Sequence, residues 1–112
     1  MLLWEQLTPP KSIERAQKEQ EIVDQQTKFL TLYQYPTCPF CIKVRKHIKS
    51  LSLNIEFCNA QHDSVIREEL LSQGGSTQVP CLKIMHNNQK HVDWLYESDD
   101  IISYLNKNFS PC

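Results

Sequence analysis

Two cysteines stand three positions apart in the segment Tyr35-Pro36-Thr37-Cys38-Pro39-Phe40-Cys41. The pair follows an apolar, β-prone run and opens a segment with helical periodicity. A thiol at the start of a helix lies among unpaired N–H groups at the positive end of the helix dipole, and both favour the thiolate. Because the thiolate is the form that attacks disulfides, the segment predicts a protein that exchanges thiols and disulfides.

The two thiols are expected to lie in different environments. Cys38 comes before or at the start of the helix, whereas Cys41 lies one turn further on its apolar face and should be buried and less ionised. Three cations of the same helix add positive potential near Cys38: Lys43, Arg45 and Lys46. Most of them are interpreted more simply as the solvated side of an amphipathic helix. We predict that Cys38 is the nucleophile, that Cys41 is the resolving thiol, and that the two form a redox disulfide.

Two other interpretations of the pair are a structural zinc site and a pair of unreactive core cysteines. Structural zinc is held by four ligands, typically from two clustered pairs. The other candidate ligands are scattered, and the histidines are expected at the surface without ligand spacing: Cys58, Cys81, His47, His62, His86 and His91. Cysteine is often buried, but Pro36 and Pro39 frame Cys38 in a loop, which favours the redox interpretation. We therefore expect no metal.

The composition is that of one soluble globular domain. The chain has 112 residues, of which 40% are hydrophobic and 22% charged, and its net charge of −1 does not indicate nucleic acid as a partner. The first residues include an acid, Glu5, and lack the apolar stretch of a signal peptide or a membrane span. Weak contact with a membrane surface is an alternative for four apolar residues: Leu2, Leu3, Trp4 and Leu7. Five cysteines, an odd number, without an export signal favour a reducing cytoplasm.

The chain divides by pattern into residues 1–28 and 29–112. The first segment is dense in Lys, Glu and Gln, which predicts an arm that is flexible or a marginal helix capped by Ser12. The second segment predicts strands over 29–33, 54–58, 79–85 and 90–96, helices over 39–51 and 64–72, and a last helix after Ser98 with Ile101, Ile102, Leu105 and Phe109 facing inward. Pro39 suits the first helical position, Gly74-Gly75 would end the second helix, and Ser98 would cap the third. The order β-α-β-α-β-β-α predicts an α/β fold in which three helices cover a four-stranded mixed sheet, with the first two strands parallel and the last two antiparallel.

The cysteine pair, this element order and the step Val79-Pro80 before the third strand resemble the dithiol glutaredoxins of the thioredoxin-like superfamily. The segment Tyr96-Glu97-Ser98-Asp99-Asp100-Ile101 is similar to the glutaredoxin-like N-terminal domains of glutathione transferases. The resemblance covers roughly residues 29–109 and rests on three motifs in order, CPFC, QVP and YES. It implies a thioredoxin-like (glutaredoxin) fold with an N-terminal extension. A conventional transferase is not expected, because the sequence ends after the third helix of the domain.

The resemblance implies a glutathione site beside the cysteine pair. The family's equivalent of Pro80 is cis and faces the cysteines, and the residue at Val79 offers its backbone to glutathione like an added strand. Glu97 and Ser98 match the pair that holds the γ-glutamyl group in the transferases. The other implied glutathione contacts are Tyr35, Thr37 and Phe40. The alternatives are that Pro80 is an ordinary strand-entry proline and that Ser98 is only a helix cap.

The expected function is that of a glutathione-dependent thiol–disulfide oxidoreductase. Cys38 would attack a protein–glutathione mixed disulfide, and a second glutathione or Cys41 would resolve the product. Glutathione is then the co-substrate. The other expected partners are glutathionylated or disulfide-containing proteins and, indirectly, glutathione reductase. The protein is expected to be a monomer. Many glutaredoxins carry Lys or Arg at the position of Tyr35, which implies weaker binding of a glutathione carboxylate here.

Two alternatives come from other classes of protein. One is a dimer that shares a 2Fe-2S cluster through Cys38 and two glutathiones, and the other is a non-catalytic adaptor whose N-terminal arm docks a partner. The proline between the cysteines, in place of the glycine of CGFS glutaredoxins, argues against dedicated cluster binding. Cys81 is expected in the core, with glutathionylation or a regulatory disulfide as the alternative, while Cys58 is expected at a strand end and Cys112 as a tail thiol.

Overall fold

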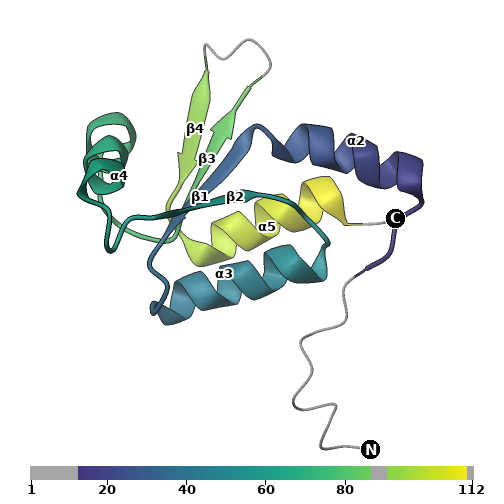
Figure 1. The fold of residues 1–112 in the computed structure, drawn as a ribbon, viewed down its shortest axis with the longest axis horizontal. Helices are drawn as coiled ribbons and strands as arrows, with labels where there is room; N and C mark the ends of the chain where they lie inside the picture. Colours follow the sequence, from purple (N-terminus) through teal and green to yellow (C-terminus); the bar gives the residue numbers. More distant parts are fainter. Residues whose placement is uncertain (1–12, 87–90, 111–112) are drawn as a thin grey trace, which may run out of the picture.

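The structure, a computed structural model, describes residues 13–86 and 91–110. Within these residues, four strands form one mixed sheet in the order β2-β1-β3-β4 (Figure 1). The strands are β1 (Leu30–Gln34), β2 (Glu56–Asn59), β3 (Cys81–Met85) and β4 (Val92–Leu95). β1 is parallel to β2 and antiparallel to β3, and β3 is antiparallel to β4. The predicted α/β class and mixed sheet are confirmed.

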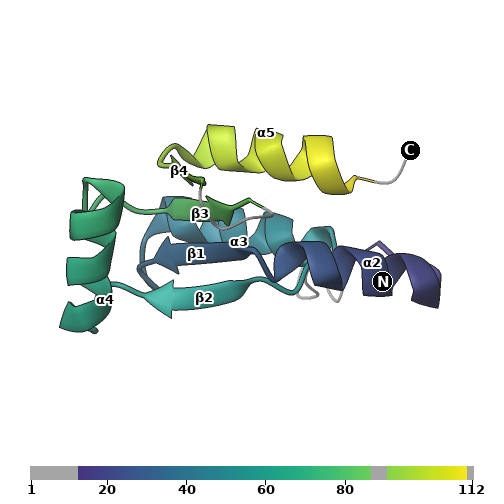
Figure 2. The ribbon, with the colours of Figure 1, turned by 90° about the horizontal axis from the view of Figure 1, so that it is seen from above.

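Helices cover the sheet and flank its ends. The helices are α2 (Gln17–Thr27), α3 (Pro39–Ser50), α4 (Ser64–Glu69) and α5 (Ser98–Phe109), and a π-helical turn over Leu70–Gly74 continues α4. α3 and α5 pack side by side on one face of the sheet, as Figure 1 and Figure 2 show from two directions. Three of these helices match the predicted ones, and α2 lies in the segment predicted as an arm. None of the described helices has the length and apolar character needed to cross a membrane.

The main core lies between the sheet and the helices α3 and α5. Successive residues of a strand point to opposite faces, so Leu30 and Leu32 of β1 enter this core while Tyr33 points to the other side. The two helices contribute buried residues at helical spacing: Val44, Ile48, Ile101, Leu105 and Phe109. These residues belong to the apolar faces predicted for the two helices. Their burial against the sheet fixes how α3 and α5, including the first turn of each, are oriented relative to the sheet.

A smaller core on the opposite face joins the sheet to α4 and the π-helical turn. Its buried members are Tyr33, Ala60, Leu70 and Cys81. The Tyr33 hydroxyl also donates a hydrogen bond to the carboxylate of Glu69, and its ring centroid lies 5.8 Å from that of Trp94. This cluster therefore fixes α4 beside the end of β1, where the chain leaves the sheet toward α3.

Two glycines end the segment that begins with α4, as predicted. Gly75 is the C-cap of the π-helical turn with φ +93°, a left-handed conformation that glycine adopts without steric cost. Its N–H donates to the carbonyl of Leu71 at 3.0 Å. A Cβ atom on Gly74 would clash with the Tyr96 hydroxyl and the Trp94 ring, so this position needs glycine for close packing.

The start of α5 differs from the prediction by one residue. Glu97 is the N-cap, with extended backbone angles (φ −96°, ψ 133°), and Ser98 is the first helical residue. The prediction that Ser98 caps this helix is therefore wrong. Serine is the preferred cap by residue type, but Glu97 takes the position without a side-chain capping bond, and a sequence pattern places a helix start only to within one or two residues.

The described part of the N-terminal segment is a helix held against the rest of the chain. α2 begins after Ala16, its N-cap, while the predicted cap Ser12 lies outside the described residues. The guanidinium of Arg15 donates through Nη2 to the carbonyl of Phe109 at 2.8 Å, which ties this segment to the end of α5. The boundary at residue 28 between arm and domain stays a prediction.

Replacement of Leu32 by alanine is expected to destabilise the protein strongly. Leu32 has 0% exposed surface in the central strand, so the truncation leaves a cavity and should lower the free energy of unfolding by about 2–5 kcal/mol. The matched control is Val65→Ala, at a side chain that is 75% exposed, which should change it by less than about 0.5 kcal/mol. Urea denaturation followed by circular dichroism measures both values, and equal losses for the two variants would contradict the described core.

Candidate active site

The turn between β1 and α3 places Cys38 at the N-cap of α3, with extended backbone angles (φ −75°, ψ 125°). Its N–H donates to the carbonyl of Tyr35 at 3.1 Å, and its own carbonyl accepts the N–H of Ile42 at 2.9 Å. Pro39 occupies the first helical turn, as predicted. Because Cys38 is the N-cap, its thiol lies close to the unpaired N–H groups of the helix start. The residue is only half-buried, so solvent can still reach it.

Cys41 lies one turn into α3, on the side of the helix that packs against the sheet. It has no exposed surface, and its Sγ accepts a hydrogen bond from the N–H of Tyr35 at 3.4 Å. The predicted difference in burial between the two thiols is therefore confirmed. All four described cysteines are free thiols, so the structure represents the reduced form of the pair.

The surroundings push the pKa values of the two thiols in opposite directions. Partial burial raises the pKa of Cys38, but hydrogen bonds from the backbone and thiol of Cys41, the N–H of Phe40 and the charge of Arg45 outweigh it, so the net pKa is below the ordinary value. Burial raises the pKa of Cys41 to about 11, with a further contribution from the neighbouring Cys38. The arrangement favours one accessible thiolate above one protonated thiol.

Arg45 has a larger structural role than the sequence suggested. Its Nη1 donates to the side-chain oxygen of Gln34, a buried residue at the end of β1, and its Nη2 donates to the carbonyl of Pro36 at 3.0 Å. It thereby fastens the turn that carries Cys38 and adds positive charge beside it. A glutamine at the end of an apolar strand was the available signal, because a buried amide requires a partner.

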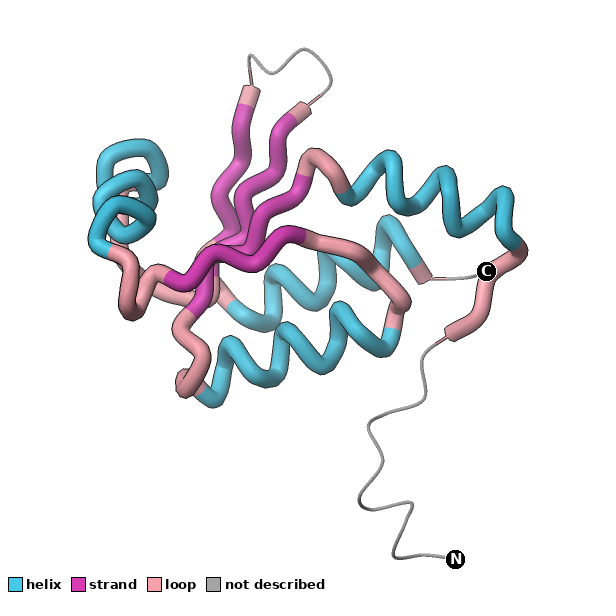
Figure 3. Tube along the Cα trace, viewed as in Figure 1, coloured by secondary structure: helices cyan, strands magenta, loops and turns pink. Residues whose placement is uncertain are grey.

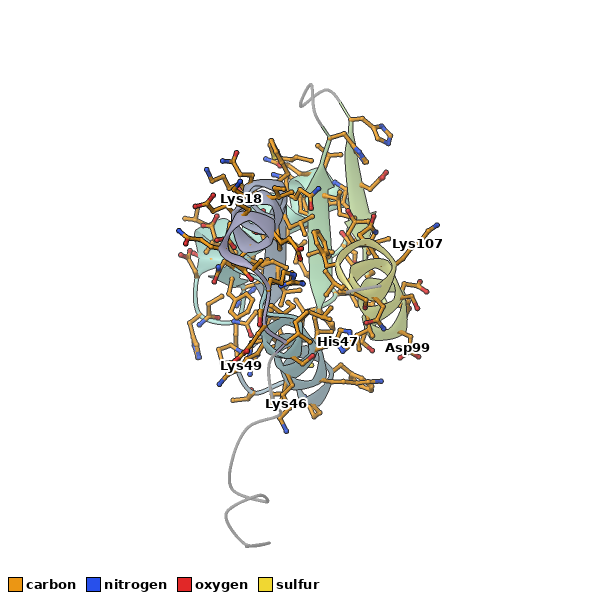
Figure 4. The ribbon with its side chains drawn as sticks, turned by 90° about the vertical axis from the view of Figure 1, so that its right-hand side faces the viewer. Lys18, Lys46, His47, Lys49, Asp99 and Lys107 are labelled. Carbon is orange, nitrogen blue, oxygen red and sulfur yellow. The ribbon has the colours of Figure 1, made fainter. Side chains whose placement is uncertain are left out.

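The other two cations named with Arg45 have different surroundings. The ammonium of Lys43 forms an ion pair with Asp99 at 3.1 Å, which joins the first turns of α3 and α5. Lys46 is exposed on the side of α3 that faces away from the sheet, as Figure 4 shows. Figure 4 also shows His47 between these two helices, where its Nε2 lies 2.7 Å from Oδ1 of Asn106. These contacts place the start of α5 beside the start of α3.

The remaining predicted site residues lie at the same end of the sheet as the cysteine pair. Tyr33 of β1 pairs with Cys81 of β3 in antiparallel register, so the chain that leaves β1 and the chain that enters β3 meet at one edge. Figure 3 shows that the loops after β1, β2 and β4 and the loop before β3 all lie there. This edge carries Glu97 and Ser98 at the start of α5, so sequence segments far apart meet around the pair.

The step Val79–Pro80 has the expected geometry. The peptide bond between the two residues is cis, and Pro80 is buried. Val79 and Tyr35 both pack against the smaller core that contains Tyr33 and Cys81. The backbone of Val79 therefore lies at the edge of the sheet beside the turn that holds Cys38.

Two predicted residues of the turn are largely exposed. Phe40 is 60% exposed, which leaves its ring free to contact a bound molecule. The hydroxyl of Thr37 lies 3.4 Å from the side-chain oxygen of Gln61, in the loop before α4. Gln61 was not predicted, because only the fold brings this loop to the turn after β1.

The other cysteines are unsuited to the same chemistry. Cys81 is fully buried, and burial raises its pKa to about 12, although a hydrogen bond with Tyr96 opposes this change. Cys58 lies in β2 and is half-buried, and burial and nearby carboxylates raise its pKa. These positions agree with the expected core and strand-end roles, while Cys112 lies outside the described residues.

Two features away from the pair were not predicted. His86 and His91 are exposed, as expected, but they are not scattered: both lie within hydrogen-bond distance of Asp93. The sequence spacing did not reveal this because the contact depends on strand register. A cavity of about 880 Å³ lies between α2, α5 and β3 and is lined by Ile22, Met85 and Tyr104 among others, away from the two reactive thiols.

Comparison with known proteins adds evidence about ancestry. Residues 32–111 match the family described as the N-terminal domain of glutathione S-transferase. A protein of Clostridium pasteurianum, described as an uncharacterized glutaredoxin-like 8.6 kDa protein in the rubredoxin operon, is 32% identical over 73 residues, which cover 61% of this chain and 97% of the relative. The family match includes Cys38, Cys41 and the helices α3 and α5.

The fold of this chain is similar to those of several solved structures. A wheat glutaredoxin superposes with a TM-score of 0.54 at 26% identity, over 81% of this chain and 80% of the other. Glutathione transferase E6 from Drosophila melanogaster gives a TM-score of 0.55 at 26% identity, over 74% of this chain but only 36% of the transferase. The predicted thioredoxin-like fold is thus confirmed, and the match to the transferase is confined to about a third of its length.

Alkylation by iodoacetamide should distinguish the two thiols. Because the pKa of Cys38 is lowered and that of Cys41 is raised to about 11, labelling near neutral pH should occur at Cys38 and spare Cys41. As the pH is lowered, thiols of the denatured chain should lose reactivity first. Cys38 of the folded protein should keep its labelling rate to a lower pH, because its pKa is lower than that of an ordinary thiol. Peptide mass mapping across pH measures both rates, and equal labelling of the two residues in the folded protein would contradict the assigned environments.

Replacement of Arg45 by methionine should raise the pKa of Cys38 and destabilise the turn. The variant loses the nearby positive charge and leaves the buried amide of Gln34 without its partner, at a cost of about 1–3 kcal/mol in the free energy of unfolding. Lys46→Met, a change of the same charge at an exposed position of the same helix, is the matched control and should alter neither quantity measurably. The absorbance of the thiolate at 240 nm and urea denaturation supply the two readouts. Equal effects of the two substitutions would contradict the role given to Arg45.

Proposed function

The chain belongs to the family of glutathione S-transferase N-terminal domains, within the glutaredoxin and thioredoxin-like superfamily, and we propose that it is a glutathione-dependent thiol–disulfide oxidoreductase. The observation that carries the proposal is the half-buried Cys38 at the start of α3, with a lowered pKa, directly beside the buried Cys41. An accessible thiolate next to a second thiol is what disulfide exchange requires.

The first proposed step is attack by Cys38 on a protein–glutathione mixed disulfide. The Cys38 thiolate bonds to the glutathione sulfur, the original disulfide breaks, and the protein thiolate departs and takes up a proton. The product is Cys38 joined to glutathione by a new disulfide. Exchange of this kind depends on the fraction of attacking thiolate, which the backbone N–H groups at the start of α3 and the charge of Arg45 increase.

Two routes complete the cycle. In the first, the thiolate of a second glutathione attacks the bound glutathione sulfur, so oxidised glutathione leaves and the Cys38 thiolate is restored. In the second, Cys41 loses its proton and attacks Cys38, releasing the glutathione thiolate and forming the Cys38–Cys41 disulfide. Two glutathione molecules then reduce this disulfide and leave as oxidised glutathione. In the first route Cys38 departs as a low-pKa sulfur, which is a good leaving group; in the second route Cys38 is the sulfur attacked, and glutathione is the leaving group.

The raised pKa of Cys41 suits its role as a resolving thiol. One cause of the raised value is the charge of Cys38 next to it. When Cys38 is joined to glutathione this charge is gone, so ionisation of Cys41 becomes easier at the stage at which it has to attack. Before that stage Cys41 stays protonated and does not compete for the substrate.

The proposed glutathione site uses the sheet edge around the pair. The backbone of Val79 would pair with the cysteinyl part of glutathione, while Pro80 and Tyr35 border the sulfur atoms. The N–H groups at the start of α5, a helix of 12 residues, would donate hydrogen bonds to the γ-glutamyl carboxylate near Glu97 and Ser98. The ion pair of Lys43 with Asp99 offsets one of the acids in this turn. Thr37 and Phe40, both exposed, are placed to contact the remainder of the molecule.

Reduction of a glutathionylated peptide by three variants tests the proposal. Cys41→Ser should remain active through the route that uses a second glutathione, whereas Cys38→Ser should show no activity above the uncatalysed exchange with glutathione. Cys58→Ser is the matched control, a half-buried thiol outside the pair, and should keep the parent rate. Activity retained by a folded Cys38→Ser protein would refute the mechanism, and loss of activity in Cys58→Ser would show that the pair is not sufficient.

A further inference from the structure

A second group of chemically capable side chains lies at the opposite end of the sheet, where β3 and β4 extend beyond the helices. His86 follows β3 and His91 precedes β4, and the N–H of His86 donates to the carbonyl of His91 at 3.0 Å. This bond continues the register in which Ile84 pairs with Asp93. Side chains at directly opposed positions, and at every second residue along a strand, share one face of a sheet. His86, His91 and Asp93 therefore project from the same face.

The three side chains converge on one point. Nε2 of His86 lies 2.9 Å from Oδ2 of Asp93, and Nε2 of His91 lies 3.0 Å from Oδ1 of the same carboxylate. The centroids of the two imidazole rings are 4.9 Å apart. One nitrogen from each histidine and one oxygen from Asp93 all lie within 4.8 Å of one another. The side chains remain 46%, 69% and 48% exposed for His86, His91 and Asp93, so an ion can reach them from solvent.

We propose that His86, His91 and Asp93 form a binding site for a divalent transition-metal ion, with zinc as the ion to be tested. Neutral imidazole and carboxylate are ligands that zinc accepts, and two histidines with one carboxylate form a known donor set for it. Zinc binds these atoms at about 2.0–2.2 Å in tetrahedral geometry, which places neighbouring donors roughly 3.4 Å apart. The two nitrogen–oxygen separations, 2.9 and 3.0 Å, are slightly shorter than this value, so small side-chain rotations that move these atoms apart would admit the ion.

The strand register makes this arrangement more than an incidental surface cluster. The backbone bond between His86 and His91 fixes the two residues opposite each other, and the carboxylate that accepts from both rings already holds them together. Binding replaces two hydrogen bonds with three metal–ligand bonds, and each ring then carries its proton on Nδ1. Three protein ligands leave one position for water or another donor, as in open zinc sites.

The site is independent of the proposed redox function. β3 begins at Cys81, opposite the end of β1 that leads into α3, whereas His86 follows the other end of the same strand (Figure 1). Thiols also bind zinc, so a valid test has to remove the reactive pair. A full-length chain carrying Cys38→Ser and Cys41→Ser provides that background, and the outcome of the metal test does not depend on whether the pair is catalytic.

Titration of zinc chloride into this background, followed by calorimetry and by imidazole ¹H–¹⁵N resonances, tests the proposal. One ion per chain should bind, and the resonances of His86 and His91 should change together. Adding His91→Gln or Asp93→Asn should weaken binding by at least about tenfold, because each removes a ligand. The matched control is His62→Gln, at an exposed histidine outside the cluster, which should leave the affinity unchanged.

Two results would overturn the proposal. One is an affinity that His91→Gln leaves unchanged, since His91 is the most exposed member and its replacement need not disturb folding. The other is the absence of any change at the His86 and His91 resonances in a tenfold excess of zinc. Backbone amide spectra of each variant verify that the hairpin is intact. Either result would identify the three side chains as a hydrogen-bonded clamp of the hairpin and nothing more.

Discussion

The hydrogen bonds that the start of α3 offers to the sulfur of Cys38 are the interaction on which the proposed function depends. Partial burial alone would raise the pKa of that thiol, and only the donors at the helix start and Arg45 reverse the balance. The later turns of α3 preserve this geometry. Val44 and Ile48 bury one face of α3 against the sheet, and Arg45 fastens the preceding turn to the end of β1. A thiolate held by fixed donors is therefore a property of the packed fold.

The sheet places the other candidate groups around this thiol by register. An antiparallel pairing of β1 with β3 brings the entry to β3 next to the exit from β1, so Val79 and Tyr35, which are far apart in the sequence, pack against the same small core. The helices α3 and α5 share one face, and the ion pair of Lys43 with Asp99 aligns their first turns. Two helix N-termini thus point to one edge, where anionic groups of a ligand are stabilised most readily.

Features with local causes were predictable from the sequence, and features with long-range causes were not. The helix at 39–50 follows from Pro39 and from apolar residues at helical spacing, and the core face of β1 follows from alternation. The bonds from Arg45 to Gln34 and the group at His86 depend on which distant segments become neighbours. The cap of α5 was missed by one residue because serine is the preferred cap by residue type, whereas in the structure Ser98 is already helical and Glu97 is an N-cap without a side-chain capping bond.

The two ends of β3 can support different chemistries because the distance between them exceeds the distance over which salt screens charges. A strand rises about 3.4 Å per residue, so the five steps from Cys81 to His86 span roughly 17 Å. The screening length at physiological ionic strength is about 8 Å, and the hairpin side chains are exposed. A doubly charged ion at the hairpin therefore contributes little to the potential at Cys38. The pKa of that thiol is set by its partial burial, by the donors at the start of α3 and by Arg45, and occupation of the hairpin site leaves these unchanged.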